Sequence, residues 1–196
     1  MNSEHTYLTF EENIKIVKKL LKDKNTMQEI NLISKKIIDS LKNSGTIYFV
    51  GNGGSAGDAA HMAAEYVGRF NFNRKGLRAI ALTSNPLTLT AIANDFSYED
   101  IFSRQIECFC KKGDVVFLYS TSGRSKNIIN GLKKANEIDV TSVGFTGINK
   151  ELMSTYCDFL ISVPSSNTAR IQEIHLLIGH IICERVEHEI FKRENV

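Results

Sequence analysis

The sequence lacks several residues and patterns that would place it in a specialised class of protein. Its 196 residues include no tryptophan, two prolines and four cysteines, with no low-complexity tract or repeat. The cysteines have neither the Cys-x-x-Cys spacing of a metal site nor a disulfide pattern, so we expect reduced, mostly buried thiols. They are Cys108, Cys110, Cys157 and Cys183. Without a recognisable linker, the chain is predicted to form one domain over residues 1–196.

The sequence also lacks a large excess of positive or negative charge, and it lacks long apolar runs. Lys and Arg total 24 against 22 Asp and Glu, and this net charge of +2 excludes the strong basic field of a typical nucleic-acid-binding domain. Residues 1–10 lack the basic and apolar stretches of a signal peptide. No apolar run approaches the roughly 20 residues that span a bilayer. We therefore expect a cytoplasmic protein that binds neither nucleic acid nor membrane.

Hydrophobic residues make up 42% of the chain, and their spacing alternates between helix-like and strand-like segments. Helical spacing predicts two helices within residues 8–42, broken near residues 23–26, and a last helix over about residues 168–192. Short apolar runs predict five buried strands, with helices near residues 55–67, 98–110 and 125–137 between them. The strands are expected at residues 46–50, 78–82, 114–119, 140–145 and 159–163.

Strands that alternate with helices are typical of an α/β fold with a doubly wound, five-stranded parallel sheet and helices on both faces. Residues 45–196 are expected to form this α/β core. Residues 1–44 precede it as an N-terminal pair of helices, which we expect to be used in oligomerisation, because one five-stranded sheet would not cover every apolar helix face.

Ligands of parallel α/β sheets bind beyond the carboxyl ends of the strands, so the loops there are the first candidates for a site. The glycine loop (residues 51–58) follows the first strand, and its glycines permit a close approach to a ligand, while Ser55 is a candidate cap for the next helix. Gly51, Gly53 and Gly57 imitate a dinucleotide-binding loop. The second strand, however, is followed by Thr83, Ser84 and Asn85 and not by the acidic residue that holds a ribose, which disfavours NAD.

The hydroxyl loop (residues 120–125) follows the third strand with the sequence Ser-Thr-Ser-Gly-Arg-Ser. An ordinary helix cap needs one hydroxyl, whereas this loop has four. Together with the free N–H groups and positive dipole end of the next helix, they form a plausible site for a phosphate monoester. Arg124 either adds a charged contact or points into solvent.

Two helices carry candidate acid–base or metal-binding residues. His61 and Glu65 are four residues apart on an alanine-rich helix, so they lie on one face, either as a metal or acid–base pair or as an ordinary exposed pair. On the last helix Gln172 and His180 are eight residues apart, about 12 Å along the axis, so one ion touches both only if each side chain reaches toward a midpoint. Most other polar residues of that helix, His188 among them, are expected on its solvated face.

Taken together and in order, these motifs resemble the sedoheptulose 7-phosphate isomerase family, whose members have the SIS (sugar isomerase) fold. The resemblance runs from about Thr46 to the end of the chain. The residues that carry it are Gly51-Asn52-Gly53-Gly54-Ser55, His61 with Glu65, Gly68-Arg69, Ala91-Ile92-Ala93-Asn94-Asp95, Phe102-Ser103-Arg104-Gln105, Ser120-Thr121-Ser122-Gly123 with Ser125, and Ala169-Arg170-Ile171-Gln172-Glu173 with His180.

The resemblance implies a homotetrameric, zinc-dependent aldose–ketose isomerase that converts sedoheptulose 7-phosphate to D-glycero-D-manno-heptose 7-phosphate for lipopolysaccharide or capsule. It makes Glu65 the general base and His180 its acid–base partner. It implies one Zn²⁺ per subunit, held by His61, Glu65, Gln172 and His180. The substrate-binding residues that it implies are Asn52, Gly53, Gly54, Ser55, Glu65, Arg69, Asn94, Asp95, Ser120, Thr121, Ser122, Ser125 and Gln172.

Some positions depart from the family pattern. Asn85 stands where an aspartate is usual and Arg124 replaces a frequent asparagine, which bears on sugar recognition and on the heptose stereoisomer formed. The main rival from another class is a non-catalytic SIS scaffold that binds the replication initiator, but such a protein has no use for the acid–base set. An isomerase or a sensor of another phosphosugar is a further alternative.

Overall fold

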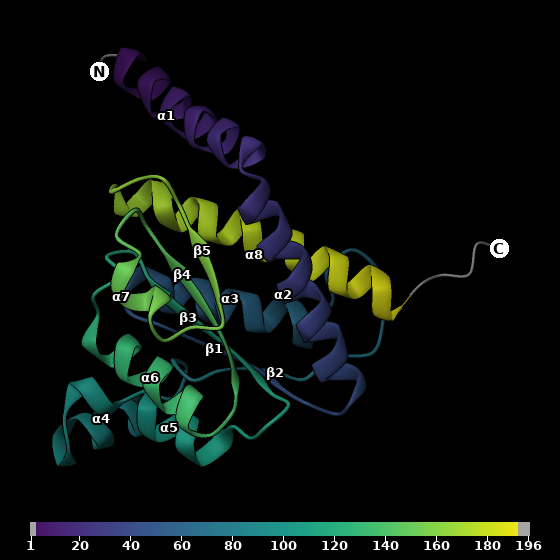
Figure 1. The fold of residues 1–196 in the computed structure, drawn as a ribbon, viewed down its shortest axis with the longest axis vertical. Coiled ribbons are helices and arrows are strands. Elements are labelled where there is room, and N and C mark those ends of the chain that lie inside the picture. The colour runs from purple at the N-terminus through teal and green to yellow at the C-terminus, as the bar shows by residue number, and fades with distance from the viewer. Residues whose placement is uncertain (1–2, 192–196) are drawn as a thin grey trace.

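The structure, a computed structural model, describes residues 3–191 and contains a five-stranded parallel sheet with the order β2-β1-β3-β4-β5 (Figure 1). The strands are β1 (Ile47–Gly51), β2 (Ala79–Ala81), β3 (Val115–Ser120), β4 (Thr141–Thr146) and β5 (Phe159–Ser162). The chain runs outward from β1 to β2 and then in the opposite direction from β3 to β5. This order places a topological switch point between β1 and β3, where ligands of doubly wound sheets bind. The predicted fold class is confirmed.

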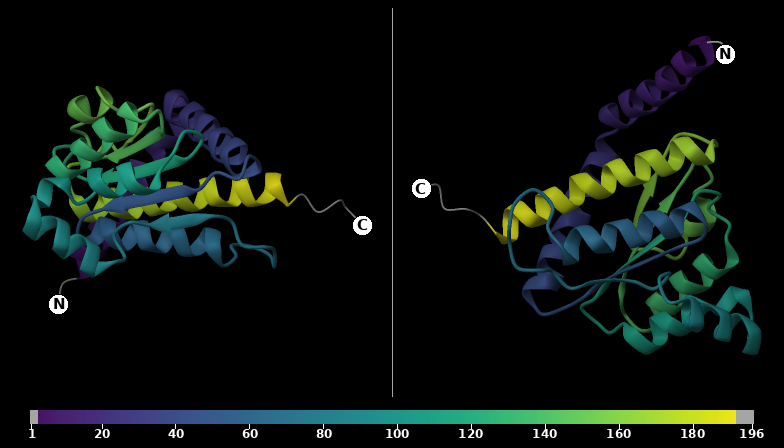
Figure 2. Two further views of the ribbon diagram at one scale, coloured as in Figure 1. Left: turned by 90° about the horizontal axis from the view of Figure 1, so that it is seen from below. Right: turned by 180° about the vertical axis from the view of Figure 1, so that it is seen from behind.

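The strands are apolar because both faces of the sheet are covered. Phe49, Phe117 and Phe145 belong to one buried cluster, whereas the alternating positions Val50 and Leu118 belong to a second cluster on the other face. The first face is covered by α2 (Lys24–Lys42), α3 (Gly54–Val67) and α8 (Thr168–Ile190), and the second by α5 (Ser103–Phe109), α6 (Lys126–Glu137) and α7 (Glu151–Ser154). Figure 2 shows α3 and α8 running side by side on the first face.

The N-terminal helix α1 (Ser3–Lys22) projects away from the sheet (Figure 1). Asp23 ends it and caps α2 by accepting a hydrogen bond from the backbone N–H of Asn25 at 3.0 Å, which explains the predicted break. Ile16 and Leu20 are buried against the body. Six large apolar residues of α1 are nevertheless exposed, namely Tyr7, Leu8, Phe10, Ile14, Val17 and Leu21.

The structure differs from the sequence prediction in three segments. The helix predicted over residues 98–110 is a 3₁₀ turn, η1 (Tyr98–Asp100), followed by the separate helix α5, because the chain bends where Ile101 and Phe102 are buried in the core. Two short helices, α4 (Pro86–Asp95) and α7, were not predicted. The last helix is described to Ile190, and the predicted end at Lys192 lies outside the described residues.

All four cysteines are free: Cys110 and Cys183 are buried, Cys157 is half-buried and Cys108 is exposed. Burial thus holds for two of the four thiols, and the reduced state stays a prediction. Within residues 3–191, every helix is too short or too polar to cross a membrane.

Candidate active site

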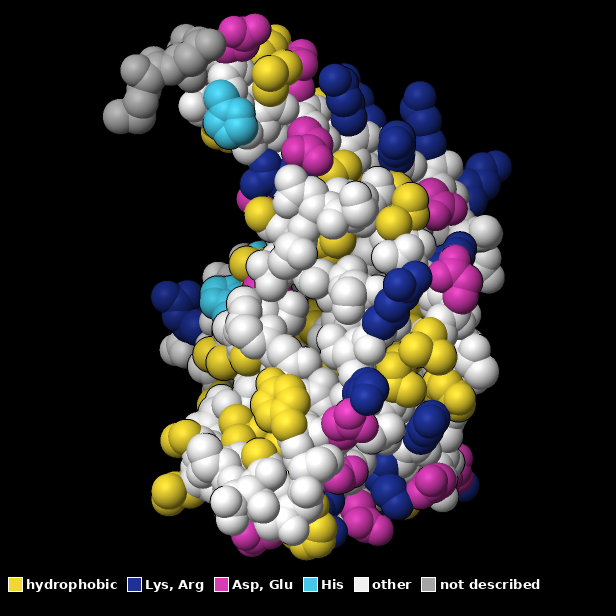
Figure 3. All heavy atoms as spheres, turned by 90° about the vertical axis from the view of Figure 1, so that its left-hand side faces the viewer, with side chains coloured by type: hydrophobic (Ala, Val, Ile, Leu, Met, Phe, Trp, Pro, Cys, Tyr) yellow, Lys and Arg dark blue, Asp and Glu magenta, His cyan; other side chains and the backbone are white. Residues whose placement is uncertain are grey.

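Two candidate loops lie at the carboxyl ends of β1 and β3, at the topological switch point, and further candidate side chains lie along α3 and α8. The glycine loop follows β1 and leads into α3, and the hydroxyl loop follows β3 and leads into α6. Helix α8 lies against α3 and brings a third set of side chains from the far end of the chain. Figure 3 shows histidine side chains exposed on the side of the body below the projecting α1.

His61, Glu65 and His180 form a histidine–carboxylate cluster between α3 and α8. The Nε2 atoms of His61 and His180 are 2.9 Å apart, and His61 Nε2 is 3.3 Å from Glu65 Oε1. His61 and Glu65 meet because they are one helical turn apart, but His180 reaches them only through the packing of α8 on α3. The ring of Phe70 covers His180, with 5.5 Å between the ring centroids. The structure therefore brings together these three predicted residues.

The chemistry of this cluster fits a divalent cation. One ligand atom from each of the three side chains lies within 4.8 Å of the others. Two imidazoles and one carboxylate are a typical ligand set of catalytic zinc, which keeps a fourth position open. Two nitrogens bound to one tetrahedral ion at about 2.0–2.1 Å are separated by roughly 3.3 Å, close to the separation of the two histidines.

Burial shifts the pKa values of groups in and beside the cluster. Partial burial lowers the pKa of His180, the proximity of His61 lowers it further, and Glu65 acts in the opposite direction. His180 is therefore biased toward the neutral imidazole that can ligate a metal or accept a proton. One turn before His61 on α3, burial raises the pKa of Asp58 to about 6, with His61 acting in the opposite direction.

Gln172, the fourth metal ligand that the resemblance implies, lies beside the start of α3. Its Nε2 donates to Ser55 Oγ at 3.3 Å, and a Cβ at Gly54 would stand 2.5 Å from that nitrogen. A side chain at position 54 would therefore displace the amide of Gln172 from its present position. Because the amide nitrogen faces Ser55, a metal would have to be met by the amide oxygen. Ser55 does not cap α3 as predicted, since the helix begins one residue earlier and its cap position is Gly53.

The side chain of Asn52, in the glycine loop, is held by two residues of other elements. Its amide pairs with that of Asn127 through two hydrogen bonds of 2.9 Å, and its Oδ1 also accepts from the hydroxyl of Tyr98 at 2.9 Å. Asn127 is buried in the first turn of α6, directly after the hydroxyl loop. The amide pair therefore joins the glycine loop to the hydroxyl loop. Gly53 follows with φ of +55°, a conformation that favours glycine.

The hydroxyl loop is organised by its own side chains. Ser120 Oγ donates to Ser125 Oγ at 3.0 Å and lies 3.5 Å from Ser122 Oγ, so three of the four hydroxyls converge. The backbone N–H of Arg124 donates to Ser122 at 3.2 Å. Ser125 precedes α6 but makes no side-chain cap, and the first N–H group of the helix that bonds its carbonyl is that of Ile128, which leaves the N–H groups before Ile128 available to an anion. Gly123 has φ of +67°, and a Cβ there would stand 1.9 Å from Asn149 O.

Other predicted residues lie at the margin of the site. Asn94 and Asp95 are exposed at the end of α4, where the amide of Asn94 donates to Asp95 at 2.8 Å. Arg69 is exposed just beyond α3, and Arg124 is also exposed. No bond joins these four side chains to the histidine–carboxylate cluster, so the structure places them near the site's loops without assigning them a ligand.

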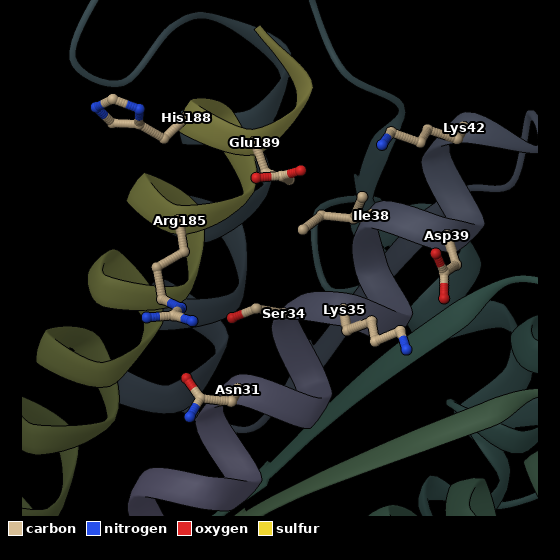
Figure 4. A pocket seen from close by; sticks show the side chains of 9 residues that line it. All are labelled: Asn31, Ser34, Lys35, Ile38, Asp39, Lys42, Arg185, His188 and Glu189. Carbon is tan, nitrogen blue, oxygen red and sulfur yellow. The ribbon is translucent and has the colours of Figure 1, made fainter. Parts of the chain in front are cut away.

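A hollow of about 500 Å³ between α2 and α8 is distinct from this site (Figure 4). Its lining carries charges of both signs and contains none of the predicted site residues. The lining residues are Asn31, Ser34, Lys35, Ile38, Asp39, Lys42, Arg185, His188 and Glu189. The exposure of His188 agrees with its predicted place on the solvated face.

Sequence reasoning missed several residues that shape the site. Asn127 and Tyr98 hold Asn52, and Asp58 lies one turn before His61 on α3, but no local pattern around Asn127 or Tyr98 signals their contacts. Arg74 is a further case, because its Nη2 donates to the backbone oxygen of Glu65 at 2.8 Å from a loop that has no regular structure. Only the distance of one helical turn between Asp58 and His61 was visible in advance.

Comparisons with known proteins show the family to which the chain belongs. The SIS domain family model matches residues 9–147. The phosphoheptose isomerase of Clostridium acetobutylicum is 48% identical over 179 residues, which cover 91% of each chain. The structure of a phosphoheptose isomerase from Neisseria gonorrhoeae superposes with a TM-score of 0.87 and 35% identity, covering 94% of this chain and 98% of that one.

A phosphoheptose isomerase structure from Francisella tularensis gives a TM-score of 0.89 at 30% identity, covering 96% of this chain and 100% of that one. These matches extend over α8, which lies beyond the part matched by the family model and carries Gln172 and His180. The chain therefore belongs to the SIS domain family and, within it, to the phosphoheptose isomerases.

Proposed function

We propose that the protein is an aldose–ketose isomerase that converts sedoheptulose 7-phosphate to D-glycero-D-manno-heptose 7-phosphate. The observation that carries this proposal is the convergence of His61, Glu65 and His180 between α3 and α8, in a chain that also has a hydroxyl-rich loop after β3 and is 48% identical to a phosphoheptose isomerase. A proton-transfer centre at one end and a phosphate-binding loop at the other suit a phosphorylated sugar.

The reaction moves a proton from C1 to C2 through an enediol. Glu65 is the proposed base, because a carboxylate on α3 can accept the C1 proton and return it to C2. His180 is the proposed acid–base partner for the sugar oxygens, and the lowered pKa keeps its imidazole neutral near pH 7. Its Nε2 atom cannot hold a transferable proton and a metal at the same time, so these two proposed roles are alternatives for that atom.

His61, Glu65 and His180 are the proposed ligands of one Zn²⁺ per subunit, with the amide oxygen of Gln172 as the fourth. When bound, the ion supplies a Lewis acid that polarises the oxygens on C1 and C2 and stabilises the enediolate. Glu65 can serve both as a metal ligand and as the base, because its carboxylate has two oxygens, one for each role.

The hydroxyl loop and the start of α6 are the proposed phosphate site. The converged hydroxyls of Ser120, Ser122 and Ser125 and the helix N–H groups can surround a phosphate monoester, and Thr121 adds a fourth hydroxyl. Fixing the phosphate sets the register of the carbon chain against Glu65. The backbone of residues 52–54, together with Ser55, Arg69, Asn94 and Asp95, is proposed to contact the sugar.

A homotetramer in the cytoplasm is the proposed assembly, with residues 1–44 as the oligomerisation element of one domain. The exposed apolar side chains of α1 support it, because a helix that projects from the body with six such residues exposed is typical of an interface. The product is proposed to feed heptose synthesis for lipopolysaccharide or capsule.

The test is an assay of purified protein with sedoheptulose 7-phosphate, following aldose formation. We expect turnover that a chelator abolishes and that added Zn²⁺ restores. An inactive protein with zinc bound would contradict the proposed substrate, and activity unchanged after complete metal removal would contradict the metal. Sedimentation equilibrium at micromolar concentration tests the assembly, and a monomer would exclude the tetramer.

A further inference from the structure

Behind the candidate active site lies a buried ion pair between Arg74 and Glu187. Arg74 Nε is 2.7 Å from Glu187 Oε1, and each side chain is 1% exposed. Arg74 lies between α3 and β2, in a segment without regular structure, and Glu187 lies near the end of α8. Burying two charges is costly unless their hydrogen-bonding groups are used fully, so the other partners of this pair are informative.

The guanidinium of Arg74 binds the backbone at the end of α3. Nη2 donates to Glu65 O at 2.8 Å, and Nη1 donates to Tyr66 O at 2.8 Å and to the carbonyls of Gly68 and Lys75 at 3.2 Å. The last carbonyls of a helix have no partner inside it, and a cation there also suits the helix dipole. Arg74 thus caps α3 and directly holds the backbone of Glu65, a residue of the cluster.

The carboxylate of Glu187 binds the backbone that covers His180. It accepts from the N–H groups of Phe70 at 2.9 Å and Asn71 at 2.7 Å, and the Phe70 ring packs on His180. Glu187 is seven residues after His180, two helical turns further along the same face of α8. Burial raises the pKa of Glu187, but the bonds from Asn71, Phe70 and Arg74 lower it below its ordinary value, so the group is a carboxylate at neutral pH.

We propose that Arg74 and Glu187 are positioning residues that set the distance between Glu65 on α3 and His180 on α8. The proposal rests on the proposed function of this cluster. One ion pair holds the backbone of Glu65 on one side and the covering segment of His180 on the other. The stability of the fold alone does not explain a charged pair at Arg74 and Glu187, because apolar side chains of similar volume often replace a buried ion pair without loss of stability. Apolar side chains cannot make the directional bonds.

The test uses full-length variants Glu187→Gln and Arg74→Met/Glu187→Met. The first keeps the shape and removes the charge, and the second replaces the whole pair with apolar side chains. For each we measure the thermal midpoint, the affinity of the metal-free protein for Zn²⁺ by competition with a chromogenic chelator, and kcat and KM separately. We expect folded proteins whose Zn²⁺ affinity falls about 10- to 100-fold. We also expect kcat to fall at least about 10-fold with KM changed less than about 3-fold, because the hydroxyl loop is not touched.

Asp114→Asn is the matched control. Asp114 is also a buried carboxylate that accepts two backbone N–H groups, from Thr46 at 2.8 Å and Lys111 at 2.9 Å, but it lies at the amino end of β3, and these two bonds are to neither α3 nor α8. It should lower the thermal midpoint and leave Zn²⁺ affinity and kcat near the parental values. Loss of both in Asp114→Asn would show that general destabilisation is the cause and would overturn the proposal.

The remaining outcomes separate the proposal from the function on which it rests. A parental protein that isomerises and binds Zn²⁺, with pair variants that match it in affinity and kcat, overturns the positioning role and leaves the proposed function intact. A parental protein that neither binds Zn²⁺ nor isomerises overturns both. A double methionine variant that is as stable as the parent but has lost Zn²⁺ affinity and kcat is the clearest support.

Discussion

The two ends of the candidate site are built in different ways. The hydroxyl loop is one continuous segment of six residues, whose Ser120 and Ser125 side chains bond each other at 3.0 Å. The histidine–carboxylate cluster joins residues 119 positions apart, His61 and His180, on two helices that meet only in the folded protein. The hydroxyl loop, the proposed phosphate site, is thus a local structure, whereas the histidine–carboxylate cluster depends on helix packing.

Because of this difference, the two ends of the site should respond differently to amino-acid substitutions. A local loop loses affinity in proportion to the hydroxyls removed. A cluster between helices is sensitive both to its own side chains and to distant residues that fix the helices, since an error of 1 Å in position has a large effect on rate. Variants at both ends of the site, and at residues around it, test this contrast.

Glu65→Gln should cause the largest loss. The substitution keeps the shape of the side chain but removes its basic oxygen, and a positioned base contributes about 10²- to 10⁴-fold in rate. Turnover is measured with sedoheptulose 7-phosphate, and zinc content is determined on the same sample, since weaker metal binding would imitate the loss. Glu107→Gln, on the exposed side of α5, is the control. Parental turnover in Glu65→Gln would exclude the proposed mechanism.

Replacing Ser120, Thr121 and Ser122 together by alanine should act on the other end. Three lost hydroxyl contacts at about 1 kcal/mol each correspond to an increase in KM of roughly 10²-fold, with a smaller effect on kcat. Competition by inorganic phosphate should weaken in parallel. Thr155→Ala, which removes an exposed hydroxyl at the end of α7, is the control. Unchanged kinetics in the triple variant would mean that the phosphate binds elsewhere.

His175 should affect stability and not chemistry, although it lies on the same helix as His180. Burial lowers its pKa from 6.5 to about 4, while its hydrogen bond to Thr146 O acts in the opposite direction. Because the folded-state pKa is depressed, His175 contributes stability above pH 6.5 that is lost progressively as the pH falls toward 4. Between pH 7 and pH 5 the loss amounts to about 2 kcal/mol.

The check is urea unfolding of the parent and of His175→Gln at both pH values. The variant should lose about 2 kcal/mol less than the parent over this range. Asp58 has a raised pKa and the opposite sign, since its contribution is lost as the pH rises through about 6, but it is common to both proteins and cancels in the difference. Equal pH dependence in the two proteins would contradict a buried neutral His175.

Tyr98→Phe should have the smallest effect. It removes one hydrogen bond to Asn52 Oδ1 and leaves the amide pair with Asn127, so we expect a change in kcat/KM of about 5-fold or less. Asn127→Asp removes a donor of that pair and should cost more than Tyr98→Phe, and steady-state kinetics of both variants measure the order. A larger loss in Tyr98→Phe would show that the hydroxyl contacts the substrate directly.

Much of the fold was predictable because the helical spacing of apolar residues and the short apolar runs of the strands are both clear in the sequence. Each of the five strands lies within two residues of its predicted position, since buried parallel strands are continuous apolar runs. Helix α4 was missed although Asn85 caps it and Pro86 stands in its first turn, a recognised start signal. The bend between η1 and α5 was missed because burial of Ile101 and Phe102 in the core is a tertiary effect.

The site was predictable to a lesser extent. The spacing of His61 and Glu65 and the number of hydroxyls in residues 120–125 are visible in the chain, because both depend on neighbours in sequence. The partner of Gln172 proved to be Ser55, which no spacing argument indicates. Roles for the marginal residues Arg69, Asn94 and Asp95 stay predictions.

The α/β class, the glycine and hydroxyl loops and the two candidate side chains on α3 could be predicted from the chain alone, because local spacing sets which residues share a turn or a face. The folded structure was needed to show that His180 meets His61 and that Asn127 holds Asn52. It also decided that Arg74 reaches both Glu65 and Glu187. The physical reason is that these contacts join segments 9 to 119 residues apart, and only helix-on-sheet packing sets their distances.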